Sequence, residues 1–229
     1  MSSPLLYTAE LDLAESDVDP FRQWYANRHA PDVYQAGFLT CTCYQAVEGD
    51  MNLLDLYELA DWGIFDSLRY KGMQGRDPYM APLMARRRNK AHTVYSQQLI
   101  APDEPGGWLN ADWLSVFRFD SPAGADAAIV LALSVELGRL RDLGLTRLRF
   151  ACRDRDHPTN PTFRPRCMVV TEWPRRPPEE AELPARLTNR FGDRITNPNV
   201  FVGRRIYPWP DRPAPDRPAP DRPAQDHPA

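Results

Sequence analysis

The sequence predicts an α+β protein in which two tandem ferredoxin-like β-α-β-β-α-β repeats form an α+β barrel, followed by a disordered C-terminal tail. Apolar residues at strand and helix spacing occur in the order β-α-β-β-α-β twice along the chain. A stretch rich in Pro and Gly, residues 101–107, separates the two expected repeats. After Tyr207 the sequence repeats PDRPA, a composition that buries little apolar surface. We therefore expect repeats at residues 1–101 and 108–208 and a tail at residues 209–229.

In the first half, we expect strands and helices in the order of one complete repeat. A strand at residues 5–13 precedes a helix at residues 19–30, with Asp19 as its N-cap and Pro20 in its first position. The remaining elements are strands at 37–47 and 53–60, a helical stretch at 62–70, a basic loop or helix at 76–89, and a last strand at 91–100.

The second half repeats this order. We expect strands at 113–119, 145–152, 167–173 and 200–207, with helices at 123–143 and 178–191. The two halves align where the second strand of each begins, since Gly37-Phe38-Leu39 matches Gly144-Leu145-Thr146. They also align in the third strands, where residues 56–59 match residues 170–173.

Several strands carry apolar residues on both faces. In the first strand Tyr7 and Ala9 point one way, and Leu6 points the other way. A ferredoxin-like unit covers only one sheet face with helices, so the open apolar face must meet another sheet. That second sheet comes from the other repeat or from a second chain, which makes the protein a monomer with pseudo-dimeric repeats or a homodimer.

Composition limits the partners. With 42% hydrophobic and 26% charged residues, the 229-residue chain can form a core. Its net charge of −3 provides no positive field for a phosphate backbone, so we expect no nucleic-acid partner. The chain has no apolar run that spans a bilayer and no secretion signal, so we expect a cytoplasmic protein without a membrane partner. The four cysteines, at positions 41, 43, 152 and 167, lack zinc-site spacing and are expected to be reduced, packed thiols without a metal.

One motif in the first half resembles a known family. Residues 21–32 read F-x-x-W-Y-x-x-x-H-x-P-D, Gly37-Phe38 opens the next strand, and Tyr57-Glu58-Leu59 lies in the third strand. Over residues 5–100 this pattern resembles the EthD-like branch of the dimeric α+β barrel superfamily. The resemblance implies a fold shared by small cofactor-free lyases, isomerases, cyclases and oxygenases, and by proteins without a known reaction. The second half lacks the motif, so we expect one histidine-dependent site per chain.

His29 is the main catalytic candidate. It follows Tyr25 by four residues, so both side chains lie on one helical face. We expect Pro31 to end the helix, which would place His29 in the last turn, where the helix dipole favours imidazolium. There His29 would act as a general acid and base, with Tyr25 in the same pocket. The alternative is that His29 only caps the helix and bonds Asp32 or a carbonyl.

Glu58 is the polar member of an apolar strand face, where a carboxylate is costly unless paired. It would orient His29 or act as a second acid–base group. Alternatively it pairs with Arg118 or Arg205, a structural role favoured by the matching Glu172 in the half without the motif.

Candidate substrate-binding residues are mostly aromatic. Trp24, Tyr7, Tyr57 and Tyr95 suit a planar ligand, although such rings also fill cores. Arg88, in a run of three arginines, would bind a carboxylate or enolate oxygen, unless the run is a solvated turn. His92 and His157 receive no catalytic role.

Together these residues predict a cofactor-independent enzyme of the isomerase, cyclase, dehydratase or decarboxylase type, with a histidine acid–base group. Its substrate would be a small hydrophobic molecule with a carbonyl group, in a biosynthetic or degradative pathway. The chain contains no nucleophile elbow, G-x-G-x-x-G motif or P-loop, which disfavours nucleotide chemistry, and we expect no cofactor. The alternative is a non-catalytic small-molecule-binding or chaperone-like protein. Haem is a further alternative, with His29, His92 or His157 as its ligand.

Overall fold

The computed structural model describes residues 4–73, 78, 81–103, 109–122, 124–160 and 163–208. The expected tail and part of the expected linker lie outside these residues. In chain order the elements are β1 (Leu5–Leu11), α1 (Glu15–Trp24), a π-helix (Tyr25–His29), α2 (Ala30–Gln35), β2 (Thr40–Glu48), β3 (Leu53–Leu59), a 3-10 helix (Trp62–Asp66), α3 (Leu68–Met73), α4 (Ala81–Arg86), β4 (Lys90–Ala101), β5 (Trp113–Asp120), α5 (Asp126–Asp142), β6 (Arg147–Cys152), β7 (Cys167–Trp173), a 3-10 helix (Glu179–Ala181), α6 (Leu183–Phe191), a 3-10 helix (Gly192–Arg194) and β8 (Thr196–Tyr207).

The strands form one closed barrel in the order β1-β3-β2-β8-β5-β7-β6-β4, and neighbouring strands are antiparallel. Strands β1 to β4 make one half of the wall and β5 to β8 make the other. The halves join where β2 pairs with β8 and where β4 pairs with β6. The barrel therefore closes within a single chain.

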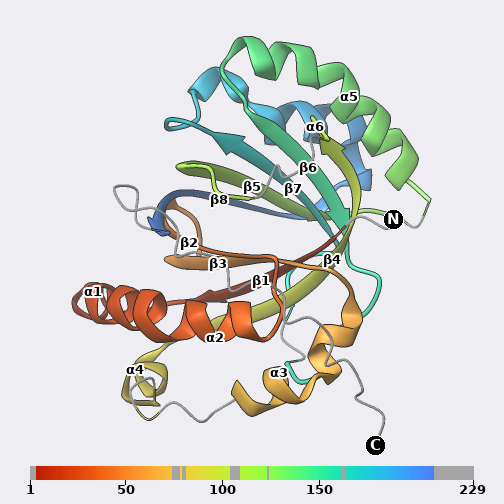
Figure 1. Ribbon diagram of the computed structural model, residues 1–229. Helices are drawn as coiled ribbons and strands as arrows, with labels where there is room; N and C mark the ends of the chain where they lie inside the picture. The colour runs from red at the N-terminus through yellow and green to blue at the C-terminus, as the bar shows by residue number, and fades with distance from the viewer. Residues whose placement is uncertain are drawn as a thin grey trace, which may run out of the picture.

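Helices cover the outside of each half. Helices α1 and α2 lie against the sheet of the first half, while α5 and α6 lie on the opposite side of the molecule (Figure 1). On α5 the buried residues Ile129, Leu133 and Leu140 recur at helical spacing and face the sheet. Among the helices of the described residues, none is both long and apolar enough to cross a membrane.

The barrel interior holds an apolar cluster and buried ion pairs. Leu6 belongs to this cluster, whereas Tyr7 and Ala9 face the helices, which confirms the expected alternation on β1. Inside the barrel Arg149 bonds both Glu58 and Glu172, at 2.7 Å each. A second buried arginine, Arg118, pairs with Glu10. Because these arginines and glutamates pair with opposite charges, the interior tolerates ions that would otherwise be costly.

The two glycines matched in the sequence occupy equivalent positions. Gly37 and Gly144 have φ angles of +97° and +99°, which only glycine adopts readily, and each ends a helix. Two residues further on, Leu39 and Thr146 donate backbone hydrogen bonds to the carbonyls of Glu58 and Glu172, at 2.8 and 2.9 Å.

The first helical segment differs from the prediction. Helix α1 begins at Glu15, so Pro20 lies inside it, and the helical path continues beyond Pro31 to Gln35. A proline normally breaks a helix because it lacks an N–H and clashes with the preceding turn. Here a π-turn precedes it, in which the Ala30 N–H bonds the Tyr25 carbonyl five residues back, and Pro31 falls in the first turn of α2. The expectation that His29 lies at a helix C-terminus, where the dipole favours imidazolium, is therefore wrong.

Candidate functional site

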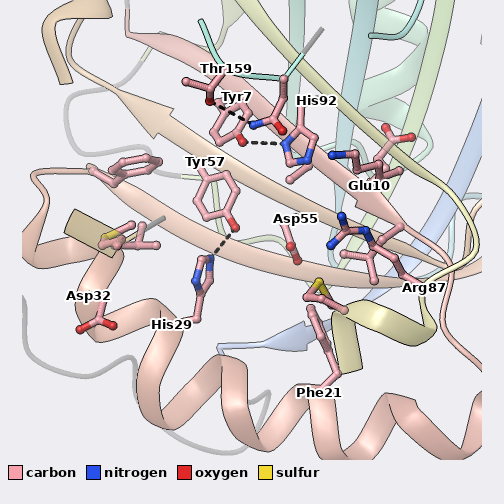
Figure 2. A pocket seen from close by; sticks show the side chains of 18 of the residues that line it. Tyr7, Glu10, Phe21, His29, Asp32, Asp55, Tyr57, Arg87, His92 and Thr159 are labelled. Atoms are coloured by element: carbon pink, nitrogen blue, oxygen red, sulfur yellow. Dashed lines mark hydrogen bonds between the residues drawn. The ribbon is translucent and has the colours of Figure 1, made fainter. Parts of the chain in front are cut away.

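A cavity of about 520 Å³ lies between the outer face of the first-half sheet and the helices that cover it. Strands β1, β3 and β4 form its floor, and side chains from α1, the π-turn, α2 and α4 form its roof (Figure 2). The rings that line it are Tyr7, Phe21, Trp24, His29, Phe38, Tyr57, Tyr70 and His92.

Two rows of paired residues make the cavity floor. In one row Tyr57 and Tyr7 are direct partners across β3 and β1, and their rings stack with centroids 5.3 Å apart. In the next row Asp55 faces Ala9, which in turn faces His92 on β4. Because Ala9 has the smallest side chain of this row, the floor is low between Asp55 and His92.

Asp55 is a buried carboxyl group at the floor of the cavity. The residue is 4% exposed, and one carboxyl oxygen has no hydrogen-bond partner within the described part of the chain. Burial raises the pKa of this carboxyl to about 7, although hydrogen bonds with Cys43, Tyr57 and Tyr25 act in the opposite direction. The group can therefore change protonation near neutral pH, as a general base must.

His29 and Tyr57 connect roof and floor. The His29 Nε2 atom lies 2.9 Å from the Tyr57 hydroxyl (Figure 2). Behind Tyr57, the Tyr25 hydroxyl donates to the Tyr57 hydroxyl at 3.2 Å and accepts from the Cys41 thiol at 3.3 Å. The Trp24 ring stacks on His29, with centroids 4.8 Å apart. Tyr25 thus holds the Tyr57 hydroxyl by a hydrogen bond and does not itself line the cavity.

A second tyrosine–histidine pair lies across the floor. The His92 Nδ1 atom is 2.8 Å from the Tyr7 hydroxyl (Figure 2), and no other described residue bonds this imidazole. Burial lowers the pKa of His92 to about 3, with the nearby His157 acting in the same direction, so the ring is neutral at physiological pH. In the tautomer whose Nδ1–H donates to the Tyr7 hydroxyl, Nε2 is free to act as an acceptor or a metal ligand.

His157 comes from the second half of the chain and packs against Tyr7 and Tyr70, which line the cavity. Its ring stacks on Tyr7 with centroids 5.1 Å apart, and its Nε2 lies 3.1 Å from the Tyr70 hydroxyl. Its Nδ1 accepts the backbone N–H groups of Thr159 and Asn160, both at 3.2 Å. This histidine therefore fixes the loop whose residues 159 and 160 line the cavity.

Of the residues predicted from sequence, His29, Trp24, Tyr7 and Tyr57 line the cavity, but Glu58 and Tyr95 do not. Glu58 points into the barrel, where it pairs with Arg149 rather than with Arg118 or Arg205. It also accepts the backbone N–H of Leu109 at 3.1 Å. The Tyr95 hydroxyl, also inside, donates to the Pro165 carbonyl at 3.2 Å.

Among the three consecutive arginines, Arg87 lines the cavity. Arg88 is exposed, and its backbone N–H bonds the Asp12 carbonyl at 3.1 Å.

Sequence reasoning missed Asp55 and gave no role to His92. A signal for Asp55 was present, since it precedes Tyr57 by two residues and must share its strand face. For His92 the signal was weaker, because its position beside Asp55 depends on the pairing of β1 with both β3 and β4.

No protein-family model matches the chain, and no curated protein matches it in sequence. Solved structures do match. An anthrone oxidase-like protein is 13% identical with a TM-score of 0.59, covering 89% of this chain and 92% of that chain. A protein of Lactobacillus acidophilus, provisionally named a monooxygenase, is 13% identical with a TM-score of 0.58, covering 89% and 94%. A haem-binding protein of Thermus thermophilus is 11% identical with a TM-score of 0.52, covering 90% and 92%.

The structural neighbours confirm the coarse fold and correct the expected chemistry. The chain shares the α+β barrel fold of these structures. Their names refer to oxidation or haem binding, and none of the three is named for isomerisation, cyclisation, dehydration or decarboxylation. The expectation of a cofactor-independent enzyme of those types is contradicted by this comparison.

Proposed function

We propose that this protein oxidises a small aromatic molecule in the cavity, with Asp55 as the base that removes a proton from it. The state of the Asp55 carboxyl carries the proposal: it is buried, one of its oxygens lacks a partner among the described residues, and its pKa is raised to about 7. A carboxylate with a purely structural role is normally paired when buried. A carboxyl with this pKa at a cavity wall is suited to accept a proton from a ligand.

The lining supports a planar aromatic ligand. The volume of about 520 Å³ lies within the roughly 300–1,000 Å³ of small-molecule sites. Phe21, Trp24 and Phe38 offer ring faces and edges, which favour aromatic ligands. The neighbours named monooxygenase and anthrone oxidase-like support this substrate class.

Proton removal prepares such a ligand for oxidation. If Asp55 takes a proton from a CH₂ group beside a carbonyl, the remaining electron pair spreads into the rings and the carbonyl. Reaction with dioxygen then forms a C–O bond and breaks the O–O bond, so that CH₂ + O₂ becomes C=O + H₂O. The substrate supplies the electrons, one oxygen atom enters the product, and the other leaves as water.

The two tyrosine–histidine pairs supply the other groups that this reaction needs. Negative charge that develops on the substrate oxygen requires hydrogen-bond donors, and Tyr57 and Tyr7 are near Asp55 on the floor. His29, half-buried beside Tyr57, is placed to return a proton. In this proposal His29 is catalytic, Trp24 and the two tyrosines bind the substrate, and Tyr25 is a positioning residue.

A haem-dependent oxidation in the same cavity is the second candidate, and His92 favours it. Its imidazole is neutral, and the Tyr7 hydroxyl holds its Nδ1 atom, as outer partners do for metal-ligating histidines. Arg87 and Lys90 line the same cavity and are suited to pair with the haem propionates. The residues present thus fit the group, with His92 as the iron ligand. Bound haem would supply activation of dioxygen or peroxide at its iron, and a structural neighbour named haem-binding supports this candidate.

We also propose a repeat origin, a place near one family branch, a monomeric state and a cytoplasmic location. The equivalent places of Gly37 and Gly144 support an origin as two tandem ferredoxin-like repeats. The motif at residues 21–32 supports a place near the EthD-like branch. Closure of the barrel within one chain supports a pseudo-dimeric monomer, and four free buried thiols support a cytoplasmic protein.

Oxidation of candidate substrates in air tests the function. The full chain, with and without added haemin, is incubated in air with anthrone and with a set of hydroxynaphthalenes, and products are identified by mass. We expect product that gains one oxygen atom and loses two hydrogens, formed by the wild type and by the control variant Asp66→Asn, which changes an exposed carboxylate. Asp55→Asn should lose the activity while still binding the ligand.

Two comparisons separate the candidates. If activity requires haemin and His92→Gln abolishes both activity and the Soret band while His29→Gln keeps the band, the haem-dependent reaction is supported. If no substrate of the set is oxidised by either preparation, or if Asp55→Asn reacts at the wild-type rate, the role of Asp55 in oxidation is overturned.

A further inference from the structure

Two cysteines of the second half form a close pair outside the cavity. Cys152 on β6 and Cys167 on β7 are direct partners in antiparallel register, and their sulfur atoms are 3.6 Å apart. Opposed residues of antiparallel strands have Cα atoms about 4.5–5.5 Å apart, within the disulfide range of about 4.4–6.8 Å. Their side chains leave the same face of the sheet. A bond between them therefore needs side-chain rotation and no change of strand register.

Polar groups surround one sulfur atom of this pair. The Arg166 Nη1 group donates to Cys167 Sγ at 3.3 Å and to Asp126 Oδ1 at 2.9 Å. The Ser121 hydroxyl lies 3.2 Å from the same sulfur. A cationic group and a hydroxyl at a sulfur stabilise its thiolate, which is the reactive form of cysteine.

The four buried thiols differ in their acidity. A hydrogen bond from Cys152 lowers the pKa of Cys167, and Ser121 and Arg166 act in the same direction. Burial raises the pKa of Cys41 and Cys43 well above the usual value. The chemistry thus singles out Cys167 among the cysteines.

We propose that Cys152 and Cys167 are a redox-active dithiol, which a peroxide converts reversibly to a disulfide. The Cys167 thiolate attacks the peroxide, the O–O bond breaks, and Cys167 becomes a sulfenic acid while an alcohol or water leaves with one proton. Cys152 then attacks that sulfur, the S–O bond breaks, and water leaves. In total, dithiol and hydrogen peroxide give disulfide and two waters, the thiols being oxidised and the peroxide reduced.

The salt bridge between Arg166 and Asp126 controls access. Both thiols are buried, whereas the Arg166 and Asp126 side chains are each 28% exposed, so the ion pair lies between the sulfurs and solvent. Carboxylate and thiol atoms of Asp126, Cys152 and Cys167 lie within 4.8 Å of one another, as in a metal site. The Arg166 guanidinium contacts two of these groups, and its positive charge disfavours a cation there, so the geometry favours thiol oxidation over metal binding.

Peptide mapping tests the dithiol. The reduced full chain is treated with a small excess of hydrogen peroxide, alkylated with N-ethylmaleimide and digested with trypsin. We expect peptide 150–153 linked to peptide 167–175, with Cys41 and Cys43 alkylated, and release of the link by dithiothreitol. In Cys152→Ser, dimedone should label Cys167 as the trapped sulfenic acid. The control Cys43→Ser should form the same link as the wild type.

Two charge variants test how the site is controlled. Arg166→Gln should slow disulfide formation by roughly tenfold, as for a rise of about one unit in the thiol pKa. Asp126→Asn keeps Arg166 but removes the salt bridge that separates the sulfurs from solvent, so disulfide formation should be faster. Melting curves identify a charge variant that fails to fold. In that case dimedone labelling of Cys167 in Cys152→Ser still tests the proposal. The proposal is overturned if peroxide produces no link, if Cys41 or Cys43 is oxidised first, or if Cys167 passes to sulfinic acid while Cys152 stays a thiol.

Discussion

The hydroxyl of Tyr57 lies 2.9 Å from Nε2 of His29, and this contact joins the strand floor of the cavity to its helical roof. Tyr57 is also bonded by Tyr25, so its hydroxyl is held from two sides. A fixed phenol beside an imidazole can pass a proton without rearrangement, which gives the pair a direct place in the proposed reaction.

His29→Asn should lower kcat by about 10²–10⁴-fold, the range for loss of a general acid or base. Asparagine keeps much of the shape but cannot titrate. The measurement is the rate of oxidation at saturating substrate over pH 5–8, with circular dichroism to verify folding. A variant that runs at the wild-type rate throughout this range would show that His29 is not catalytic.

The rate of the wild type should rise with pH through about 7, because Asp55 acts as a base only when its carboxyl, with a pKa of about 7, has lost its proton. Asp55→Asn should be slow at all pH values and lack this rise. Initial rates in a constant-ionic-strength buffer series provide the check. An unchanged inflection in the Asn variant would assign it to another group.

Asp55 should also make stability depend on pH. Its pKa is about 7 in the folded protein, against roughly 3.9 for an unperturbed aspartate. The folded state therefore binds the extra proton between these values, so this contribution to stability is complete below about pH 4 and is lost as pH rises through 7. The free energy of unfolding of Asp55→Asn should match that of the wild type near pH 4 and exceed it at pH 8 by on the order of 4 kcal/mol. Urea unfolding at both pH values, with Asp66→Asn as control, measures this difference. An equal gain in unfolding free energy at pH 4 and pH 8 would contradict the prediction.

Ala9→Leu should block the cavity, because position 9 lies between Asp55 and His92 on the floor. We expect ligand affinity to fall at least about tenfold, while stability changes little since the new side chain enters open space. Isothermal titration with an aromatic ligand measures the loss. The matched control is Ala85→Leu on the exposed side of α4, and equal binding by both variants would place the ligand elsewhere.

Glu58→Gln should destabilise the fold without changing the reaction. Removal of one partner from a buried ion pair costs about 3–5 kcal/mol, and Glu58 shares Arg149 with Glu172. Glu172→Gln, in the opposite half, is the matched variant and should have a similar effect on the urea midpoint. If Glu58→Gln alone lowered kcat in folded protein, Glu58 would be catalytic after all.

Local chemistry made much of the fold predictable. Strict alternation on β1 placed Tyr7 and Leu6 on opposite faces, and the structure agrees. The match between Gly37 and Gly144 was expected at the start of two strands; in the structure both glycines end a helix with positive φ, and the strands begin three residues later. Pro31 misled the prediction, because its effect depends on whether a π-turn precedes it, and that turn is set by packing of Tyr25 and His29 against the sheet.

The sequence alone determined the order of strands and helices, the alternation of strand faces and the histidine motif, because each depends on neighbours a few residues apart. Only the tertiary structure decided that Asp55 lies across Ala9 from His92, that His157 from the other half stacks on Tyr7, and that Glu58 turns inward to Arg149. The residues that these contacts join are between 46 and 150 positions apart in the chain. Burial, which gives Asp55 its raised pKa, exists only once that pairing has closed the barrel and the helices have covered it.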